Sequence, residues 1–259
     1  MGLIIPILLF ISLVGDSPVA IVNGVKIYQK VIEVSLHDQV ILLSNSEGPW
    51  HQIKPIPKEY DNLSSGVKPI TDIEYEVLEL SKTQSLNVNE LRPGTFHFIN
   101  GDEFTEYFSS SKPLTSSYPQ VIKLIVREED SYVGYLTEQL GLPFIIPPKT
   151  LPGIGHQTDL QIGTDCAELA IYGRRRQGFK IEYGGPRGIR NHLVETNQIF
   201  PGLILHFGHQ VSILYKDFGK IGQIDDEDLL IHAYQDKVQI QRFGDTDLFG
   251  DPYQTMTWK

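Results

Sequence analysis

The sequence predicts an α+β fold: a β-rich N-terminal half followed by a C-terminal half that combines helices with strands. Three observations support this. Short apolar runs separated by turn residues fill the chain up to residue 127. Apolar residues at helical spacing follow, at Tyr132, Val133, Leu136 and Leu140. Two further strand-like apolar runs lie at 203–215 and 229–234.

Length and composition bound the class of protein. The chain has 259 residues, of which 41% are hydrophobic, so it can form a core without disulfides or metal. Its formal net charge is -10, which argues against a nucleic-acid partner, because the phosphate backbone binds basic surfaces. The single cysteine, Cys166, is an inert buried residue, a ligand or a nucleophile.

The N-terminus is predicted to direct export. Residues 1–15 form an apolar run of the length of a secretory signal, too short for a comfortable membrane span, and Ala20 closes the small residues that follow. We therefore expect a signal peptide over 1–20 and a location in the cell envelope, periplasmic or extracellular. A buried N-terminal strand is the alternative. No other segment reads as a membrane span.

The N-terminal half reads as a series of strands. The pair Asn23-Gly24 between two apolar runs predicts a hairpin. Residues 40–43 and 50–53 predict a strand, a turn and a second strand, and residues 54–72 predict a long loop. Further strands are expected at 95–99 and 121–126, with an exposed connector at 109–113 between them.

A domain boundary is predicted near residues 127–131, where the strand pattern gives way to a helical one. Acidic residues at 128–130 suit a helix N-terminus, and Gly141 suits its end. We therefore expect a β-rich domain over 21–127 and a second domain over 128–259.

Cys166 is placed where a nucleophile could be built. Asp165 is a natural N-cap, and Glu168 is its capping-box partner, so Cys166 becomes the first residue of a helix. The three arginines at 174–176 and then Gly178 suit the end of that helix. A helix N-terminus favours the thiolate and lowers a cysteine pKa. The alternative is inert packing, which is common for free cysteines.

Two histidines are candidate partners of this thiol. His209 shares one face of a predicted strand with Val211, Ile213 and Tyr215, and His232 lies in the next strand. If the two strands pair, both rings can lie on the face that receives the Cys166 helix, where imidazole could accept a thiol proton. Each histidine could instead be an ordinary strand-end residue. A zinc site is the third option, formed from His156, His206, His209 and His232.

In this order the C-terminal motifs resemble the NlpC-type family of bacterial cell-wall cysteine peptidases. Residues 140–145 (LGLPFI) resemble its LGxPYV segment, and 165–169 (DCAEL) resemble DCSGL. Residues 201–207 (PGLILHF) resemble GDLVFF, 209–215 (HQVSILY) resemble HVGIYVG, and 231–233 (IHA) resemble FIHA. The resemblance runs from about residue 132 to 243.

The resemblance implies a papain-like α+β domain with helices packed on an antiparallel sheet. It implies that Cys166 is the nucleophile, that His209 is the general base, and that His232 orients the His209 ring. The expected reaction is hydrolysis of peptide bonds in peptidoglycan stem peptides through a thioacyl enzyme, with no cofactor or metal. Asp165, Phe144 and His156 are the expected supporting positions, although Phe144 replaces a tyrosine that helps to hold the oxyanion.

Two other functions stay open. A protein that kept the fold and lost turnover would bind the cell wall without catalysis, and the replacements at Phe144 and Ala167 suggest this. Transfer of the acyl group to an acceptor other than water is the other option. Residues 38–53 resemble part of a bacterial Src-homology-3-like wall-binding domain. Residues 184–188 (GGPRG) lack the phosphate-loop pattern and predict a surface turn.

Overall fold

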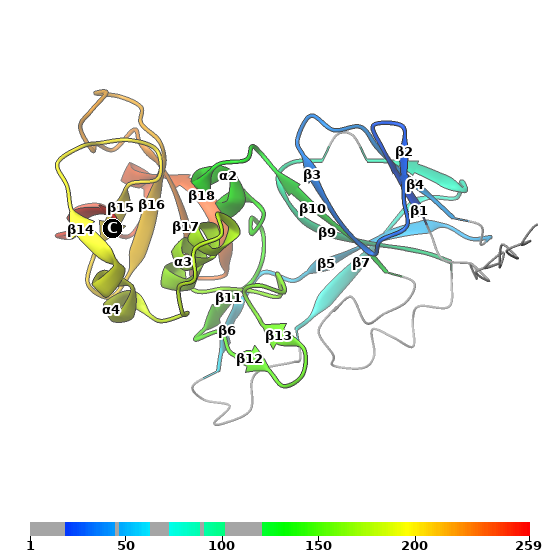
Figure 1. The fold of residues 1–259 in the computed structure, drawn as a ribbon, viewed down its shortest axis with the longest axis horizontal. Helices are drawn as coiled ribbons and strands as arrows, with labels where there is room; N and C mark the ends of the chain where they lie inside the picture. The colour runs from blue at the N-terminus through cyan, green and yellow to red at the C-terminus, as the bar shows by residue number, and fades with distance from the viewer. Residues whose placement is uncertain (1–18, 45–46, 63–72, 89–90, 102–120) are drawn as a thin grey trace, which may run out of the picture.

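The protein is mostly β. The computed structural model describes residues 19–44, 47–62, 73–88, 91–101 and 121–259. Strands account for 41% of these residues and helices for 13%. Figure 1 shows N-terminal strands at one end of the molecule, a larger C-terminal sheet at the other, and short helices between them.

Two sheets form the N-terminal half. The four-stranded sheet has the order β2 (Val25–Ile27), β1 (Val19–Val22), β4 (Val40–Leu43) and β8 (Ser85–Asn87). The five-stranded sheet has the order β3 (Val31–Ser35), β10 (Ile122–Arg127), β9 (Gly94–Asn100), β5 (Trp50–Pro55) and β7 (Tyr75–Ser81).

One apolar cluster joins the two sheets. Ala20 and Leu42 from the four-stranded sheet pack in the same cluster as Trp50, Phe98 and Leu124 from the five-stranded sheet. Because side chains alternate along a strand, the five-stranded sheet turns its other face away from this core. That second face carries Glu33, Thr95, His97 and Lys123, and it is directed toward the C-terminal half.

The predicted hairpin at Asn23-Gly24 is confirmed. Val22 pairs with Val25, and both turn residues have positive φ, 49° at Asn23 and 83° at Gly24, as a two-residue type I′ turn requires. The strands predicted at 95–99 and 121–126 are β9 and β10, which pair antiparallel. The connector predicted at 109–113 lies outside the described residues.

The strands predicted over 40–43 and 50–53 are confirmed as β4 and β5, but they do not pair with each other. β4 pairs with β1 and β8, whereas β5 pairs with β7 and β9 in the other sheet. The apolar residues Leu42 and Trp50 meet instead across the core between the sheets. Local pattern located both strands but could not show that the chain crosses from one sheet to the other between them.

Strands near the middle of the molecule connect the two halves. β6 (Glu59–Asp61), inside the predicted loop 54–72, pairs in parallel with β11 (Phe144–Ile146) of the C-terminal half. A short hairpin of β12 (Thr150–Leu151) and β13 (Gly155–His156) follows β11. The N-terminal half therefore supplies a strand to the C-terminal half.

The C-terminal half is built on a six-stranded sheet. Its order is β14 (Leu193–Glu195), β19 (Gln254–Trp258), β15 (Ile204–His206), β16 (Val211–Lys216), β17 (Leu229–Tyr234) and β18 (Lys237–Arg242). The helices are α2 (Tyr132–Thr137), α3 (Cys166–Arg176), α4 (Pro186–Ile189) and two 3-10 turns, η1 (Arg190–His192) and η2 (Phe243–Asp245).

The predicted papain-like α+β class was wrong, because strands dominate and the helices are few and short. α2 has six residues and ends before Leu140, and within the described residues the only α-helix beyond α3 is the four-residue α4. The physical reason is visible between residues 178 and 188, where four glycines and Pro186 interrupt any longer helix. Helical spacing over 132–140 predicted a longer helix than tertiary packing allows.

The predictions about the N-terminus fall largely outside the described residues. Residues 1–18 are not described, so the signal peptide and export stay predictions. Ala20, the last residue of that predicted segment, lies in β1 and is buried in the N-terminal core. Among the residues described, no helix is long and apolar enough to cross a membrane.

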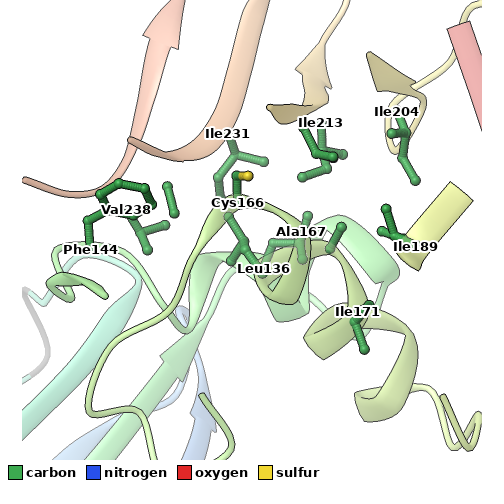
Figure 2. Packing of buried hydrophobic residues seen from close by; sticks show 14 of the residues in the cluster. Leu136, Phe144, Cys166, Ala167, Ile171, Ile189, Ile204, Ile213, Ile231 and Val238 are labelled. Carbon is green, nitrogen blue, oxygen red and sulfur yellow. The ribbon is translucent and has the colours of Figure 1, made fainter. Parts of the chain in front are cut away.

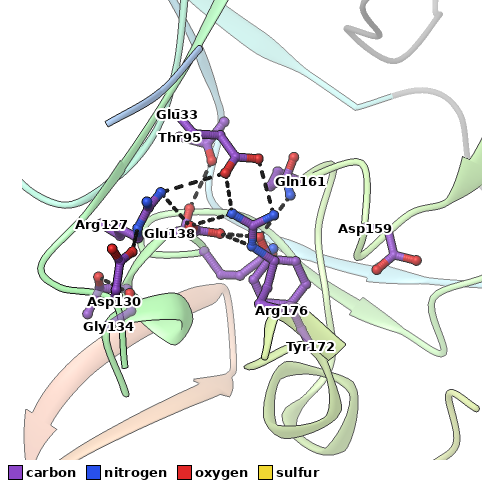
Figure 3. A network of polar contacts seen from close by, with 12 residues as sticks. Glu33, Thr95, Arg127, Asp130, Gly134, Glu138, Asp159, Gln161, Tyr172 and Arg176 are labelled. Carbon is purple, nitrogen blue, oxygen red and sulfur yellow. Dashed lines mark hydrogen bonds and ion pairs between the residues drawn. The ribbon is translucent and has the colours of Figure 1, made fainter. Parts of the chain in front are cut away.

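A polar network centred on Glu138 joins the two halves (Figure 3). The Glu138 side chain is fully buried, accepts a hydrogen bond from the Tyr172 hydroxyl, and lies 3.1 Å from the Arg176 Nε of α3. Arg176 also makes a two-pronged ion pair with Glu33 of β3, at 2.5 and 3.1 Å. From the same sheet, the Thr95 hydroxyl donates to the Glu138 carbonyl oxygen at 2.9 Å. The network fixes α3 against the five-stranded sheet.

Removal of the Glu138 carboxylate should strongly destabilise the protein. In Glu138→Ala, the buried Tyr172 hydroxyl and part of the Arg176 guanidinium lose their acceptor, so we expect the free energy of unfolding to fall by about 3 kcal/mol or more. Urea unfolding at pH 7 measures this. Glu79→Ala removes a carboxylate from an exposed pair with Lys82 and should change stability by less than about 0.5 kcal/mol. Equal losses in the two variants would contradict the role given to Glu138.

Candidate functional site

The helix predicted to carry the cysteine is confirmed as α3. Asp165 is its N-cap, and its side chain accepts a hydrogen bond from the Glu168 backbone N–H at 2.8 Å. Gly178, just beyond the helix, has a φ of 92°, the left-handed conformation that suits a helix end. Cys166 is the first residue of the helix, as the sequence predicted.

The surroundings of Cys166 are apolar. The residue is only 4% exposed, and it belongs to a cluster with Leu136, Phe144, Ile213 and Ile231. Figure 2 shows its sulfur directed toward Ile231 of the sheet. Burial raises the pKa of the Cys166 thiol far above its usual range, and the nearby Asp165 raises it further. Hydrogen bonds from backbone groups of Val211 and Ala167 oppose this rise without overcoming it. The lowered pKa expected at a helix N-terminus is therefore not found.

His209 lies in an exposed turn and is not among the described groups that affect the pKa of the Cys166 thiol. The β15–β16 hairpin closes at residues 207–210, where the Phe207 N–H donates to the Gln210 carbonyl. His209 is exposed there, two positions before Val211, whose backbone contacts the thiol. Val211, Ile213 and Tyr215 pack in or against the cluster around Cys166, as the predicted alternation requires, but His209 precedes β16 and does not share this strand face.

The structure does not bring His232 to the cysteine. Ile231 and Ala233 face the Cys166 cluster, so the alternation of β17 turns His232 to the opposite face of the sheet. There it is fully buried and opposite Gln239 of β18. Burial lowers the pKa of His232 to about 4, against a contact with Gln241 that raises it. The expected arrangement, with both histidine rings facing Cys166, is corrected by strand register.

Phe144 and His156 take different places around α3. Phe144 packs in the Cys166 cluster. His156 stacks on Tyr183, with ring centroids 4.1 Å apart, and its Nε2 lies 3.5 Å from a carboxylate oxygen of Glu168. In the parts of the chain that are described, no group of three or more His, Cys, Asp or Glu residues is arranged to hold a metal ion. The four-histidine zinc alternative therefore has no geometric basis.

A buried acidic pair lies at the start of α3. Burial raises the pKa of Asp165 to about 6. Burial, and then the charge of Asp165, raise the pKa of Glu168 to about 9, while a hydrogen bond from the Thr158 hydroxyl at 3.0 Å lowers it. Glu168 therefore holds its proton to a higher pH than an exposed carboxyl group does. The sequence identified the capping role of this pair but not its burial, which depends on the β12–β13 hairpin and the turn after it.

A pocket at the β15–β16 turn was not predicted. It has a volume of about 720 Å³ and lies between α4 and the β15–β16 turn. We call it the arginine pocket. Its lining residues are Gly185, Pro186, Arg187, Gly188, Arg190, His206, Gly208 and His209. The signal in the sequence was the predicted surface turn at 184–188, which contains the exposed Arg187 and is followed by the exposed Arg190, although nothing local shows that it faces the histidines.

His206 fixes the wall of the arginine pocket. Its Nδ1 accepts from the Gly208 N–H at 3.1 Å, so its Nε2 carries the proton and donates to the Pro186 carbonyl at 2.7 Å. This bond joins α4 to β15. His206 pairs across the hairpin with Val211, the residue that contacts the thiol. The arginine pocket and Cys166 therefore lie at the same end of the sheet.

Comparison of the chain with family models, curated proteins and solved structures gave no match.

The buried acid Glu168 should make stability fall with rising pH. A carboxyl group whose pKa is raised by folding binds its proton more tightly in the folded state, so stability is lost as pH rises from its unfolded value toward about 9. Glu168→Gln keeps a neutral group in place. We expect the stability of this variant relative to the wild type to increase by about 1 to 3 kcal/mol between pH 5.5 and 8.5, measured by urea unfolding. Glu182→Gln, at an exposed position, is the control. If the stability difference between Glu168→Gln and the wild type does not change with pH, the raised pKa of Glu168 is contradicted.

Proposed function

We propose that the C-terminal half binds a ligand carrying a carboxylate or phosphate group in the arginine pocket, without chemistry at Cys166. The observation that carries this proposal is the composition of the pocket. Two arginines and two histidines line it, and none of the lining residues that the structure describes is acidic, in a chain whose net charge is -10.

The arginines supply the chemistry for an anion. A guanidinium group donates parallel hydrogen bonds that match both oxygens of a carboxylate or phosphate. Arg187 is exposed, and within the described residues Arg190 makes only a long, exposed ion pair with Glu195 at 3.9 Å. Because such exposed pairs contribute little, an incoming anion can displace it.

The walls of the arginine pocket are suited to a ligand. Gly185, Gly188 and Gly208 present backbone rather than side chains, which leaves room for a ligand to approach closely. The hydrogen bonds of His206 hold both sides of the pocket in place. Binding to such a preformed site avoids part of the entropic cost of ordering.

The buried and protonated thiol of Cys166 argues against catalysis at this residue. A thiol nucleophile needs an accessible thiolate, a base and a group that orients the base. Burial and Asp165 keep the Cys166 thiol protonated, and His232 lies on the far face of the sheet. These observations support the binding alternative raised by the sequence.

The resemblance to cell-wall peptidases indicates which ligand to test first. Peptidoglycan stem peptides carry free carboxylates, the group to which the arginine pocket is suited. Export to the cell envelope, predicted from residues 1–20, would bring the protein to that ligand. The stem-peptide ligand and the location in the cell envelope are both parts of this proposal.

Loss of the two arginines should abolish most of the binding. For a synthetic stem peptide, titration calorimetry should show an affinity for Arg187→Ala/Arg190→Ala at least about tenfold weaker than for the wild type, because each charge-assisted hydrogen bond contributes about 1.5 to 3 kcal/mol. Arg92→Ala removes the same charge from an exposed site in the N-terminal half and should leave the affinity unchanged. The same peptide with its carboxylates amidated should bind weakly to the wild type. Equal affinity of the double variant and the wild type would refute the proposal.

A cysteine hydrolase, or an acyltransferase using the same thiol, is the second candidate function. The observation that favours it is the position of Cys166 at the capped start of α3, with backbone groups of Val211 and Ala167 directed at its sulfur and His209 in the adjoining turn. Opening of the apolar cluster around the thiol would be required before attack on a substrate.

Alkylation and turnover separate the two candidate functions. With a buried, protonated thiol, we expect iodoacetamide at pH 7 to leave Cys166 unmodified in the folded protein and to modify it fully in urea. We also expect muropeptides to give the same product masses with wild type and Cys166→Ala, with circular dichroism confirming that the variant folds. Rapid alkylation of the native protein together with a product that needs Cys166 would overturn catalytic silence and establish the hydrolase.

A further inference from the structure

A second pocket lies at the junction of the two halves, away from the arginine pocket. It has a volume of about 290 Å³, near the lower end of the range for small-molecule sites. We call it the junction pocket. β3 and β10 of the five-stranded sheet form one side, and the turn at 159–161 with α3 forms the other. Its polar lining residues are Glu33, Lys123, Asp159, Gln161, Tyr172 and Arg176.

Lys123 is unusual among the lining residues. It is only 6% exposed, although lysine is seldom buried without a charged partner. Its Nζ donates to the Leu160 carbonyl at 2.5 Å, and within the described ranges it makes no ion pair with a carboxylate. One neutral acceptor thus holds an amine that could donate three hydrogen bonds.

The nearby carboxylates are engaged by other cations. Glu33 and Glu138 are paired with Arg176 and Arg127. Asp159 accepts from Arg175 at 3.0 Å and from the Tyr183 hydroxyl at 2.5 Å. The Tyr172 hydroxyl donates to Glu138. The carboxylates near Lys123 are therefore largely paired with arginines and tyrosine hydroxyls rather than with Lys123.

The residue opposite Lys123 on the neighbouring strand offers no negative charge to the lysine. His97 of β9 pairs with Lys123 in the ladder and is buried, and in the part of the chain that the structure describes neither of its ring nitrogens has a hydrogen-bond partner. Burial lowers the pKa of His97 to about 3, so the ring is neutral.

This buried environment favours the uncharged form of the Lys123 amine. Burial lowers the pKa of Lys123 to about 7, while Glu138 and Glu33 raise it by a smaller amount. About half of the Lys123 side chains are then neutral at pH 7, whereas an ordinary lysine with a pKa near 10.4 is almost wholly charged. The neutral amine carries the lone pair that attacks electrophiles.

We propose that Lys123 is a nucleophilic amine that captures a small aldehyde or ketone in the junction pocket as an imine. The nitrogen lone pair forms the bond to the carbonyl carbon, which gives a carbinolamine. The carbonyl oxygen then leaves as water with the two hydrogens of the amine, and a carbon–nitrogen double bond remains. The reaction is reversible and needs no oxidant or reductant.

The location of the junction pocket gives the adduct a structural consequence. Lys123 belongs to the five-stranded sheet, while Leu160 and Gln161 belong to the C-terminal half. Imine formation would remove both hydrogens from the nitrogen, so the neutral imine could no longer donate to the Leu160 carbonyl. A captured carbonyl compound would therefore contact both halves at the junction fixed by Glu138.

Reductive trapping tests the proposal on the full-length protein. Glycolaldehyde at a limiting concentration, with sodium cyanoborohydride at pH 7, converts any imine into a stable secondary amine that peptide mass mapping locates. We expect Lys123 to be labelled at least about tenfold faster than the exposed Lys180 and Lys220, because burial lowers the pKa of Lys123 and increases the neutral fraction of its amine. Labelling of Lys123 should rise with a midpoint near pH 7.

Two variants test whether the fast labelling depends on Lys123 and on the space in the junction pocket. Lys123→Met should lose the fast-labelled site, and Val31→Phe, which fills the junction pocket, should slow labelling at Lys123 but not at Lys180. The comparison within the wild-type protein decides the matter even if a variant fails to fold. Labelling of Lys180 and Lys220 ahead of Lys123 would overturn the proposal and leave Lys123 with only a structural role toward Leu160.

Discussion

The buried carboxylate of Glu138 is the interaction on which the arrangement of the two halves depends. It lies between the five-stranded sheet and α3, where it joins Tyr172 and Arg176 while Arg176 reaches Glu33. Burial raises the pKa of Glu138, against the opposing effects of Tyr172 and Arg176, so its charge is tolerated only because these partners are in place. The same contacts position α3, which carries Cys166, and close one side of the junction pocket.

The second constraint is the alternation of side chains along the strands. In the five-stranded sheet it gives one face to the apolar core and the other to Glu33, His97 and Lys123. In the six-stranded sheet it gives Ile231 and Ala233 to the cysteine cluster and turns His232 away. A shift of one residue in either register would exchange these sets, so the chemistry available at each face follows from strand pairing.

The two pockets differ in how they handle charge. The arginine pocket is open and cationic in an acidic protein, which suits an anionic ligand held by hydrogen bonds. The junction pocket is smaller; its Glu33 and Arg176 pair with each other, and its lysine lacks an ion-pair partner within the described residues. Cys166, the residue that the sequence made most conspicuous, lies between apolar side chains and lines neither pocket.

The sequence by itself determined the local elements: the Asn23-Gly24 hairpin, the strands β9, β10, β16 and β17, and the helix α3 with its Asp165 cap. These depend on turn chemistry, capping and periodicity, which act over a few residues. Only the tertiary structure decided that β4 and β5 belong to different sheets, that His232 faces away from Cys166, and that strands outweigh helices. It also decided the burial that raises the pKa of the Cys166 thiol and lowers that of Lys123, because desolvation depends on which distant segments cover a group and no local pattern records that.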